Sequence, residues 1–178
     1  MTTELLPAHT VEAPFSAAPK RLALIASKGS LDQAYPPLVL ATTAASMGWD
    51  VGIFFTFYGL DIVHEKRSRK LAVSPVGNPA MPPPVRGVPV GIPTVIGALP
   101  GMRSAATWMM KGWLKRSNLA PVSELLDIAR ELGVRLFACN TTLAVMGVRA
   151  EDLIDGVELA GAPTFLDFAG DADVQLFV

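Results

Sequence analysis

Arg21-Leu-Ala-Leu-Ile-Ala-Ser27 and Val51-Gly-Ile-Phe-Phe-Thr-Phe57 are two continuous apolar runs, separated by a segment with helical spacing. Apolar runs of this length without alternation are typical of strands that are buried on both faces. A helix between two such strands makes a βαβ unit, whose crossover should be right-handed. This first unit predicts an α/β fold built on parallel strands.

The helix between these two strands carries an unusual pair of prolines, Pro36 and Pro37. Proline is tolerated in the first turn of a helix but not in its interior. We therefore expect this helix either to begin near Tyr35 or to bend there, and to end near Gly48.

The same alternation returns in the second half of the chain. A helical stripe from Val122 to Leu132 ends at Gly133, and Val134-Arg-Leu-Phe-Ala138 follows as a strand that leads directly to Cys139. The sequence thus predicts a single α/β domain over 21–178 with a mostly parallel five-stranded sheet. The remaining elements are expected as a short helix over 141–146, a helical turn over 150–154, a strand over 156–159, a helix over 163–169 and a strand over 174–178.

Residues 72–118 interrupt this pattern, and we expect them to form a proline-rich insertion. Eight prolines lie between positions 75 and 100, and Gly87–Met102 contains no charged residue. We expect a hydrophobic loop folded onto the domain, followed by an amphipathic helix over Met102–Asn118. The loop is too short and too interrupted by Gly and Pro to span a membrane. Contact of the loop with a membrane or with another subunit stays open.

The composition indicates a protein that associates with copies of itself. Of 178 residues, 51% are hydrophobic and only 17% are charged, and the mean hydropathy is +0.39. Such an apolar surface suggests a homo-oligomer. The net charge of −1 and the pI of about 6.1 do not favour a nucleic-acid partner.

Residues 1–20 are expected to form a mobile N-terminal tail. They contain Glu4 and Glu12 and lack both an early basic cluster and a long apolar core, so they do not resemble an export signal. We therefore expect the protein in the reducing cytoplasm, where a thiol stays available.

The chain has a single cysteine, Cys139, which excludes an intrachain disulfide and a cysteine-rich metal site. The thiol is an inert core residue, a reactive group or an intermolecular bridge. In open α/β sheets, chemistry gathers beyond the carboxyl ends of the strands, where Cys139 is expected. The positive end of the helix that opens at Asn140, Thr141 and Thr142 favours a thiolate there, which lowers its pKa. The three polar residues can cap the helix or donate to the sulfur.

Other chemistries have less support in the sequence. His9 lies in the tail and His64 in a charged stretch that indicates a solvated helix face; neither has metal-ligand spacing to a second His or Cys. We therefore expect no metal and no cofactor. Lys28 follows the first strand in a turn that can accept an anion, but the glycine spacing of a nucleotide-binding loop is missing.

Several segments together resemble the DsrE/DsrF-like proteins, in the branch sometimes labelled peroxiredoxin-like. They are Val51-Gly-Ile-Phe-Phe-Thr-Phe-Tyr-Gly-Leu60, Trp108-Met-Met-Lys111, the Ala138-Cys139 junction, Val145-Met-Gly147 and Leu153-Ile-Asp-Gly-Val-Glu158. The resemblance extends from Arg21 to Leu166 and keeps the order of the segments. It implies a flavodoxin-like three-layer domain that assembles into trimers, tetramers or hexamers.

The resemblance also implies a sulfur carrier or sulfurtransferase. The cysteine after the corresponding strand in such proteins accepts sulfane sulfur as a persulfide, or a thiosulfonate group, and Cys139 matches that position. The implied partners are a rhodanese-type donor and a TusA-like acceptor. The peroxiredoxin label would imply peroxide reduction, for which this chain offers no resolving cysteine.

Further candidates for the substrate pocket are Tyr58, Met109, Lys28 and Lys111, beside the three residues that follow Cys139. Two alternatives stay open. One is an oligomeric binding or assembly protein with a silent cysteine, and the other is a small-molecule-binding protein of flavodoxin-like type.

Overall fold

A five-stranded sheet forms the centre of the structure, a computed structural model that describes residues 19–74 and 101–178. Its neighbouring strands are all parallel and lie in the order β4-β3-β2-β1-β5. The predicted parallel sheet is confirmed, with each strand boundary within two residues of the expected one. The strands are β1 (Arg21–Ala26), β2 (Asp50–Phe55), β3 (Arg135–Cys139), β4 (Val157–Ala160) and β5 (Val174–Phe177).

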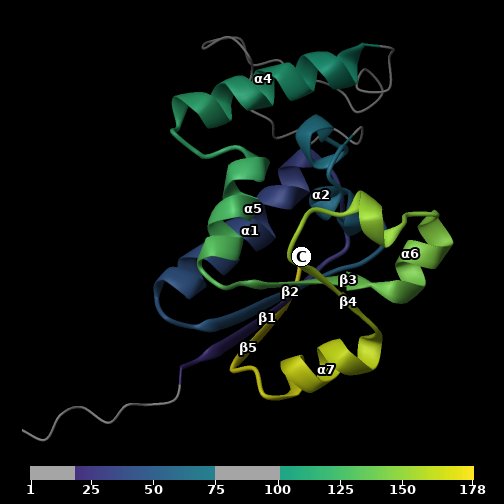
Figure 1. Cartoon of the computed structure of the whole chain (residues 1–178). Helices are drawn as coiled ribbons and strands as arrows, with labels where there is room; N and C mark the ends of the chain where they lie inside the picture. Colours follow the sequence, from purple (N-terminus) through teal and green to yellow (C-terminus); the bar gives the residue numbers. More distant parts are fainter. Residues whose placement is uncertain (1–18, 75–100) are drawn as a thin grey trace, which may run out of the picture.

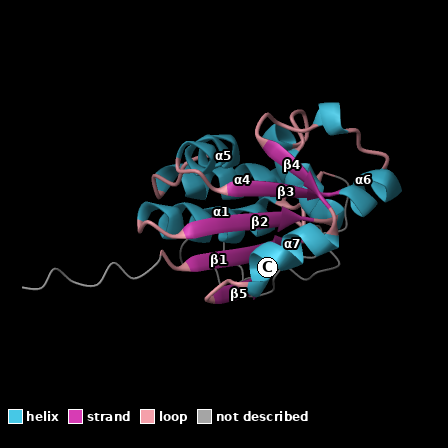
Figure 2. Ribbon diagram, turned by 60° about the horizontal axis from the view of Figure 1, so that its bottom comes forward, coloured by secondary structure: helices cyan, strands magenta, loops and turns pink. Residues whose placement is uncertain are grey.

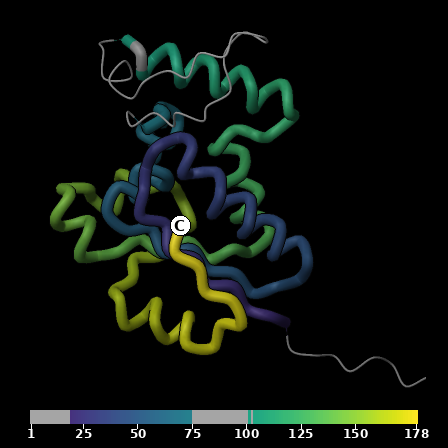
Figure 3. The backbone as a smooth tube through the Cα atoms, turned by 180° about the vertical axis from the view of Figure 1, so that it is seen from behind, coloured from purple at the N-terminus to yellow at the C-terminus, as the bar shows by residue number. Residues whose placement is uncertain are grey.

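Helices cover both faces of the sheet, and the three-layer arrangement expected of a flavodoxin-like domain is confirmed, with a strand order of its own (Figures 1 and 2). α1 (Leu31–Ser46) and α5 (Val122–Glu131) pack on one face, and α7 (Ala162–Gly170) covers the other. α4 (Met102–Arg116) lies outside α1 and α5 (Figure 3). α6 (Asn140–Met146) continues from β3. The short helical segments are η1 (Phe57–Gly59), α2 (Leu60–Val63), η2 (Ser68–Lys70) and η3 (Ala150–Asp152).

The alternation of side chains along the strands divides the core into two apolar clusters. On β3, Leu136 belongs to the larger cluster beside α1 and α5, whereas Phe137 and Cys139 belong to the smaller cluster beside α7. Four phenylalanines dominate the smaller cluster, and the rings of Phe54 and Phe165 stack with their centres 4.7 Å apart. The functional candidate therefore lies on the α7 face of the sheet.

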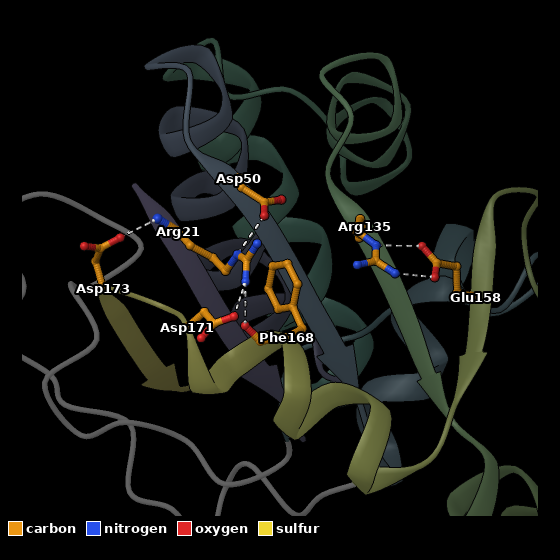
Figure 4. A network of polar contacts seen from close by, with 7 residues as sticks. All are labelled: Arg21, Asp50, Arg135, Glu158, Phe168, Asp171 and Asp173. Carbon is orange, nitrogen blue, oxygen red and sulfur yellow. Dashed lines mark hydrogen bonds and ion pairs between the residues drawn. The ribbon is translucent and has the colours of Figure 1, made fainter. Parts of the chain in front are cut away.

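Two arginines fasten the layers together at the amino ends of the strands (Figure 4). Arg21 Nε lies 2.7 Å from an Asp50 carboxylate oxygen, and the guanidinium lies 4.8 Å from the ring centre of Phe168 on α7. Arg135 donates two hydrogen bonds to Glu158, at 3.0 and 2.8 Å. Partly exposed ion pairs of this kind contribute about 0–1 kcal/mol each. The side chains at the amino edge of the sheet thus stabilise the fold.

α1 begins at Leu31, so the first of the two expected alternatives, a start near Tyr35, is wrong, and a bend there stays a prediction. Pro36 and Pro37 lie in the second turn, where each removes an N–H that would bond to the preceding turn. Pro37 is fully buried in the core. Apolar burial of its ring offsets the lost hydrogen bonds, a tertiary effect that local propensity does not reveal.

His64 is buried, which corrects the expectation of a solvated helix face around it. It forms an antiparallel bridge with Leu153, and the Ile154 N–H donates to the Val63 carbonyl at 2.9 Å beside it. Its Nδ1 accepts the Lys66 backbone N–H at 3.2 Å. Burial lowers the pKa of His64. Backbone hydrogen bonds beside His64, rather than its imidazole, therefore tie α2 to the segment before β4.

The other sequence-based expectations have mixed outcomes. The amphipathic helix after the proline-rich stretch is present as α4, with Met109 and Met110 half-buried. Leu132, expected in the stripe of α5, is exposed because the helix ends at Glu131. The domain boundaries and the proline-rich loop stay predictions, since residues 1–18 and 75–100 lie outside the described residues. Within 19–74 and 101–178, no helix combines the length and apolar character that crossing a bilayer requires.

Close backbone approach fixes the loops at the carboxyl ends of β1 and β2. A Cβ on Gly59 would clash with the carbonyl group of Ala26, and a Cβ on Gly29 would clash with that of Tyr58. The same Ala26 oxygen accepts the Thr56 N–H at 3.0 Å. These glycines therefore hold the two loops against each other.

We predict that Gly59→Ala lowers the free energy of unfolding by about 1–3 kcal/mol, because backbone atoms must shift to admit the methyl group. Gly112→Ala, in α4 with open space around its Cβ, should raise that free energy by about 0.5–1 kcal/mol. Urea unfolding of both variants tests this pair. Equal stabilities for the two variants would contradict the proposed close approach.

Candidate functional site

Cys139 is the last residue of β3 and the N-cap of α6. It lies opposite Ala160 of β4 in the sheet register. Its side chain is 8% exposed and borders the phenylalanine cluster beneath α7. Such apolar surroundings raise the pKa of a thiol, because the thiolate loses hydration.

Hydrogen-bond donors at the start of α6 reverse this effect. Burial raises the pKa of Cys139, but the hydroxyl and backbone N–H of Thr142, the hydroxyl of Thr56 and the backbone N–H of Thr141 lower it by a larger amount together. The pKa of Cys139 therefore lies below its ordinary value. This is the direction expected for a cysteine at this position in the sequence. The thiolate population near neutral pH is correspondingly raised.

Sequence reasoning missed Thr56, which lies directly after β2. Its hydroxyl oxygen is 2.9 Å from the hydroxyl oxygen of Thr142. Each hydroxyl carries one proton, so a hydroxyl that donates to the sulfur cannot donate to its neighbour at the same time. Both hydroxyls can turn toward a thiolate, whereas one can bond to the other beside a neutral thiol. The position of Thr56 directly after a predicted strand was the one sequence feature that indicated its role, because the carboxyl ends of neighbouring parallel strands lie side by side.

The chain after Thr56 presents two aromatic side chains to solvent. Phe57 has a φ of 48°, in the left-handed region that a bulky residue rarely adopts, and its side chain is 57% exposed. Tyr58 is exposed as well. The turn is closed by the Gly59 N–H, which donates to the Thr56 carbonyl at 2.9 Å. The backbone that positions Thr56 is therefore held in a strained conformation, a feature often found at functional sites.

The other residues proposed from the sequence are distributed around the molecule. Asn140 opens α6 and is exposed. Lys28 and Tyr58 line a cleft of about 640 Å³ at the carboxyl end of β1, which Cys139 does not line. Met109 and Lys111 lie on α4, which is separated from the sheet by α1 and α5 (Figures 1 and 3). The structure therefore gathers Thr141 and Thr142 at the sulfur but not these residues.

Metal chemistry has no visible centre in the part of the chain that the structure describes. No three His, Cys, Asp or Glu side chains within 19–74 and 101–178 are grouped closely enough to hold an ion. The site is thus a single thiol with hydroxyl and amide donors.

Comparison with known proteins agrees with this arrangement. A model of the DsrE/DsrF/DrsH-like family matches residues 18–177. The chain belongs to this family. The resemblance noted in the sequence is thereby confirmed, over the whole of the described sheet.

Two relatives cover nearly the full length of the chain. The sulfur carrier protein DsrE2 of Allochromatium vinosum is 45% identical over 159 residues, which are 89% of this chain and 98% of that protein. The uncharacterized protein YrkE of Bacillus subtilis is 28% identical over 163 residues, with coverage of 89% and 97%. The crystal structure of the ychN protein from E. coli has the same fold, with a TM-score of 0.53 at 15% identity, covering 89% of this chain and 99% of that one.

We predict that Thr142→Val raises the pKa of Cys139. The substitution removes the hydroxyl that lowers this pKa more than the Thr56 hydroxyl does, and valine has nearly the same shape as threonine. The rate of iodoacetamide alkylation against pH gives this pKa, and its midpoint should move upward. Thr141→Val is the matched control, because Thr141 acts on the sulfur through its backbone N–H, which valine retains. Equal shifts in the two variants would exclude the Thr142 hydroxyl as the cause.

Proposed function

We propose that this protein is a sulfur carrier that holds sulfane sulfur or a thiosulfonate group on Cys139. The observation that carries the proposal is the lowered pKa of a thiol at the carboxyl edge of the sheet, with hydroxyl and amide donors directed at it. The relative named as a sulfur carrier protein supports it, since the two chains align over nearly their whole length. On this proposal the protein acts as a sulfurtransferase, in the cytoplasm.

Loading follows ordinary thiol exchange. The Cys139 thiolate attacks the outer sulfur of a donor persulfide, a new S–S bond forms, and the donor's own S–S bond breaks. The donor leaves as a thiolate with the bonding electron pair, and the outer sulfur keeps its proton. With tetrathionate the same attack leaves a thiosulfonate group on Cys139 and releases thiosulfate. Attack by an acceptor thiolate on the sulfur bonded to Sγ breaks the Sγ–S bond, transfers the cargo to the acceptor and regenerates the Cys139 thiolate.

The donors that stabilise the thiolate also suit the loaded state. The outer sulfur of the persulfide lies one S–S bond, about 2.05 Å, beyond Sγ, and the persulfide becomes an anion when that sulfur loses its proton. Because Cys139 borders the surface with 8% of its side chain exposed, this extension carries the transferable sulfur toward solvent. The inner sulfur stays between Thr142 and Thr56. A small donor is therefore expected to reach Cys139 more readily than a bulky one.

Within this proposal the donor is a rhodanese-type protein and the acceptor is a TusA-like carrier, the partners that the family resemblance implies. Phe57 and Tyr58 support such docking, because exposed aromatic side chains are frequent anchors at protein interfaces.

Mass spectrometry of the intact native protein tests the proposal. After exposure to tetrathionate the chain should gain the mass of one thiosulfonate group, and a thiol reductant should remove it. Cys139→Ser should gain no such mass, because it removes the only thiol. Modification only after unfolding in urea would indicate a silent, buried cysteine and thus an assembly protein instead.

Self-association is a further part of the proposal, as a trimer, tetramer or hexamer. β5 is an edge strand, with Leu176 40% and Phe177 70% exposed. Phe177 is paired with Ile25 and lies on the α7 side of the sheet, where Leu166 of α7 is also exposed. Edge strands with apolar side chains are sites at which chains associate.

Light scattering after size exclusion should therefore show a mass above that of the monomer, and Phe177→Lys should shift the protein toward the monomer by placing a charge in the interface. Trp108→Lys, on the exposed side of α4, is the control and should leave the mass unchanged. A monomeric wild-type protein would remove this part of the proposal without affecting sulfur transfer.

A further inference from the structure

A second cleft lies on the opposite side of the helical layer from Cys139, where α4 turns into α5. Its volume is about 580 Å³, within the range of roughly 300–1,000 Å³ that is usual for small-molecule sites. The start of α1, η2, the last turns of α4 and the loop over 118–121 enclose it. Because these walls come from separate parts of the chain, the cleft is formed by the tertiary fold and is not a groove along a single helix.

The floor of this cleft is apolar and belongs to the core. Leu31, Leu71 and Val122 line it and are buried, so their positions are fixed by core packing. Leu114 and Leu119 extend the apolar lining toward α4. The apolar body of a ligand would displace water from this surface when it binds. The side chains of the floor would not have to rearrange, because core packing already holds them in place.

Three cations surround the apolar floor. Arg69, Lys111 and Lys115 line the cleft, and none of them forms an ion pair with a carboxylate in the described ranges. Glu124 is the one carboxylate among the described lining residues. Five other arginines of the described chain are paired with Asp or Glu, namely Arg21, Arg67, Arg130, Arg135 and Arg149. Three positive charges against one negative leave the lining of the cleft with a net charge of +2.

Tyr35 adds a neutral donor to this lining. Its side chain is half-buried, and no hydrogen bond from its hydroxyl to another described residue is present. Burial raises the pKa of Tyr35, so the phenol keeps its proton and can donate. A ligand oxygen is a natural acceptor for this donor.

We propose that this cleft binds an amphipathic organic anion, with its apolar body on the leucine floor and its carboxylate or sulfonate head beside Lys111, Lys115 and Arg69. A cationic ligand would meet three like charges there. A small inorganic anion would leave the apolar floor in contact with water. The inference stands apart from sulfur transfer, because no residue of the Cys139 site lines the cleft.

Binding of anilinonaphthalene sulfonate to the full-length protein, measured by fluorescence and calorimetry, tests the proposal. We expect saturable binding at one site per chain and displacement by decanesulfonate. Methanesulfonate, which lacks the apolar body, and decanol, which lacks the anionic head, should displace the probe at least about tenfold less effectively. Absence of saturable binding, or equal displacement by methanesulfonate or decanol, overturns the proposal.

Matched variants locate the probe. Lys111→Gln with Lys115→Gln should weaken binding by about tenfold or more, because charge-assisted contacts to the head are lost. Arg116→Gln removes the same charge from the same helix outside the cleft and should change the dissociation constant less than about twofold. Cys139→Ser should bind like the wild type. If Arg116→Gln weakened binding equally, or if the two lysine substitutions left the dissociation constant unchanged, the probe would bind elsewhere and the proposed site would be wrong.

Discussion

The stability of a thiolate at Cys139 depends on two opposing effects, the apolar surroundings of the sulfur and the hydrogen-bond donors directed at it. Phenylalanine rings beneath α7 remove water from one side, which disfavours charge, while Thr142 and Thr56 direct hydroxyls at the other. The same loss of water that raises the cost of the charge also strengthens each hydrogen bond to it. These donors together outweigh the loss of hydration, so the pKa of Cys139 falls below its ordinary value. The site is therefore a property of two neighbouring strand ends and the start of α6, and not of the cysteine alone.

The candidate site and the contacts that stabilise the fold lie at opposite edges of the sheet. Ion pairs of Arg21 and Arg135 join neighbouring strands at the amino edge, and their cation–π contacts with Phe168 hold α7 there. At the carboxyl edge, backbone contacts through Gly29 and Gly59 hold the loops without side chains. The strain at Phe57 is sustained because the loops on either side of it are packed so tightly.

The sequence predicts what depends on local patterns. The three inner strands β1, β2 and β3 are buried apolar runs and were recognisable as such, and the residues after Cys139 follow directly from one of them. Thr56 was missed because its role requires the register of β2 beside β3, which no local pattern carries. His64 was misjudged for a similar reason, since its neighbours are charged and its burial comes from a bridge to the distant Leu153. Pro37 shows the same principle, because core burial outweighs helix propensity.

Burial of the thiol is consistent with a carrier rather than opposed to it. An exposed thiolate exchanges with any small thiol in solution, so sulfur loaded on it would be lost before an acceptor arrived. A thiolate that is 8% exposed is protected from most collisions, while the hydrogen bonds to it keep its pKa low. In the proposed function, selectivity then depends on access, because a partner must bring its own sulfur to a thiol that is largely buried. In the proposed carrier, slower loading is exchanged for retention of the cargo, and the contacts on the two sides of Cys139 determine both.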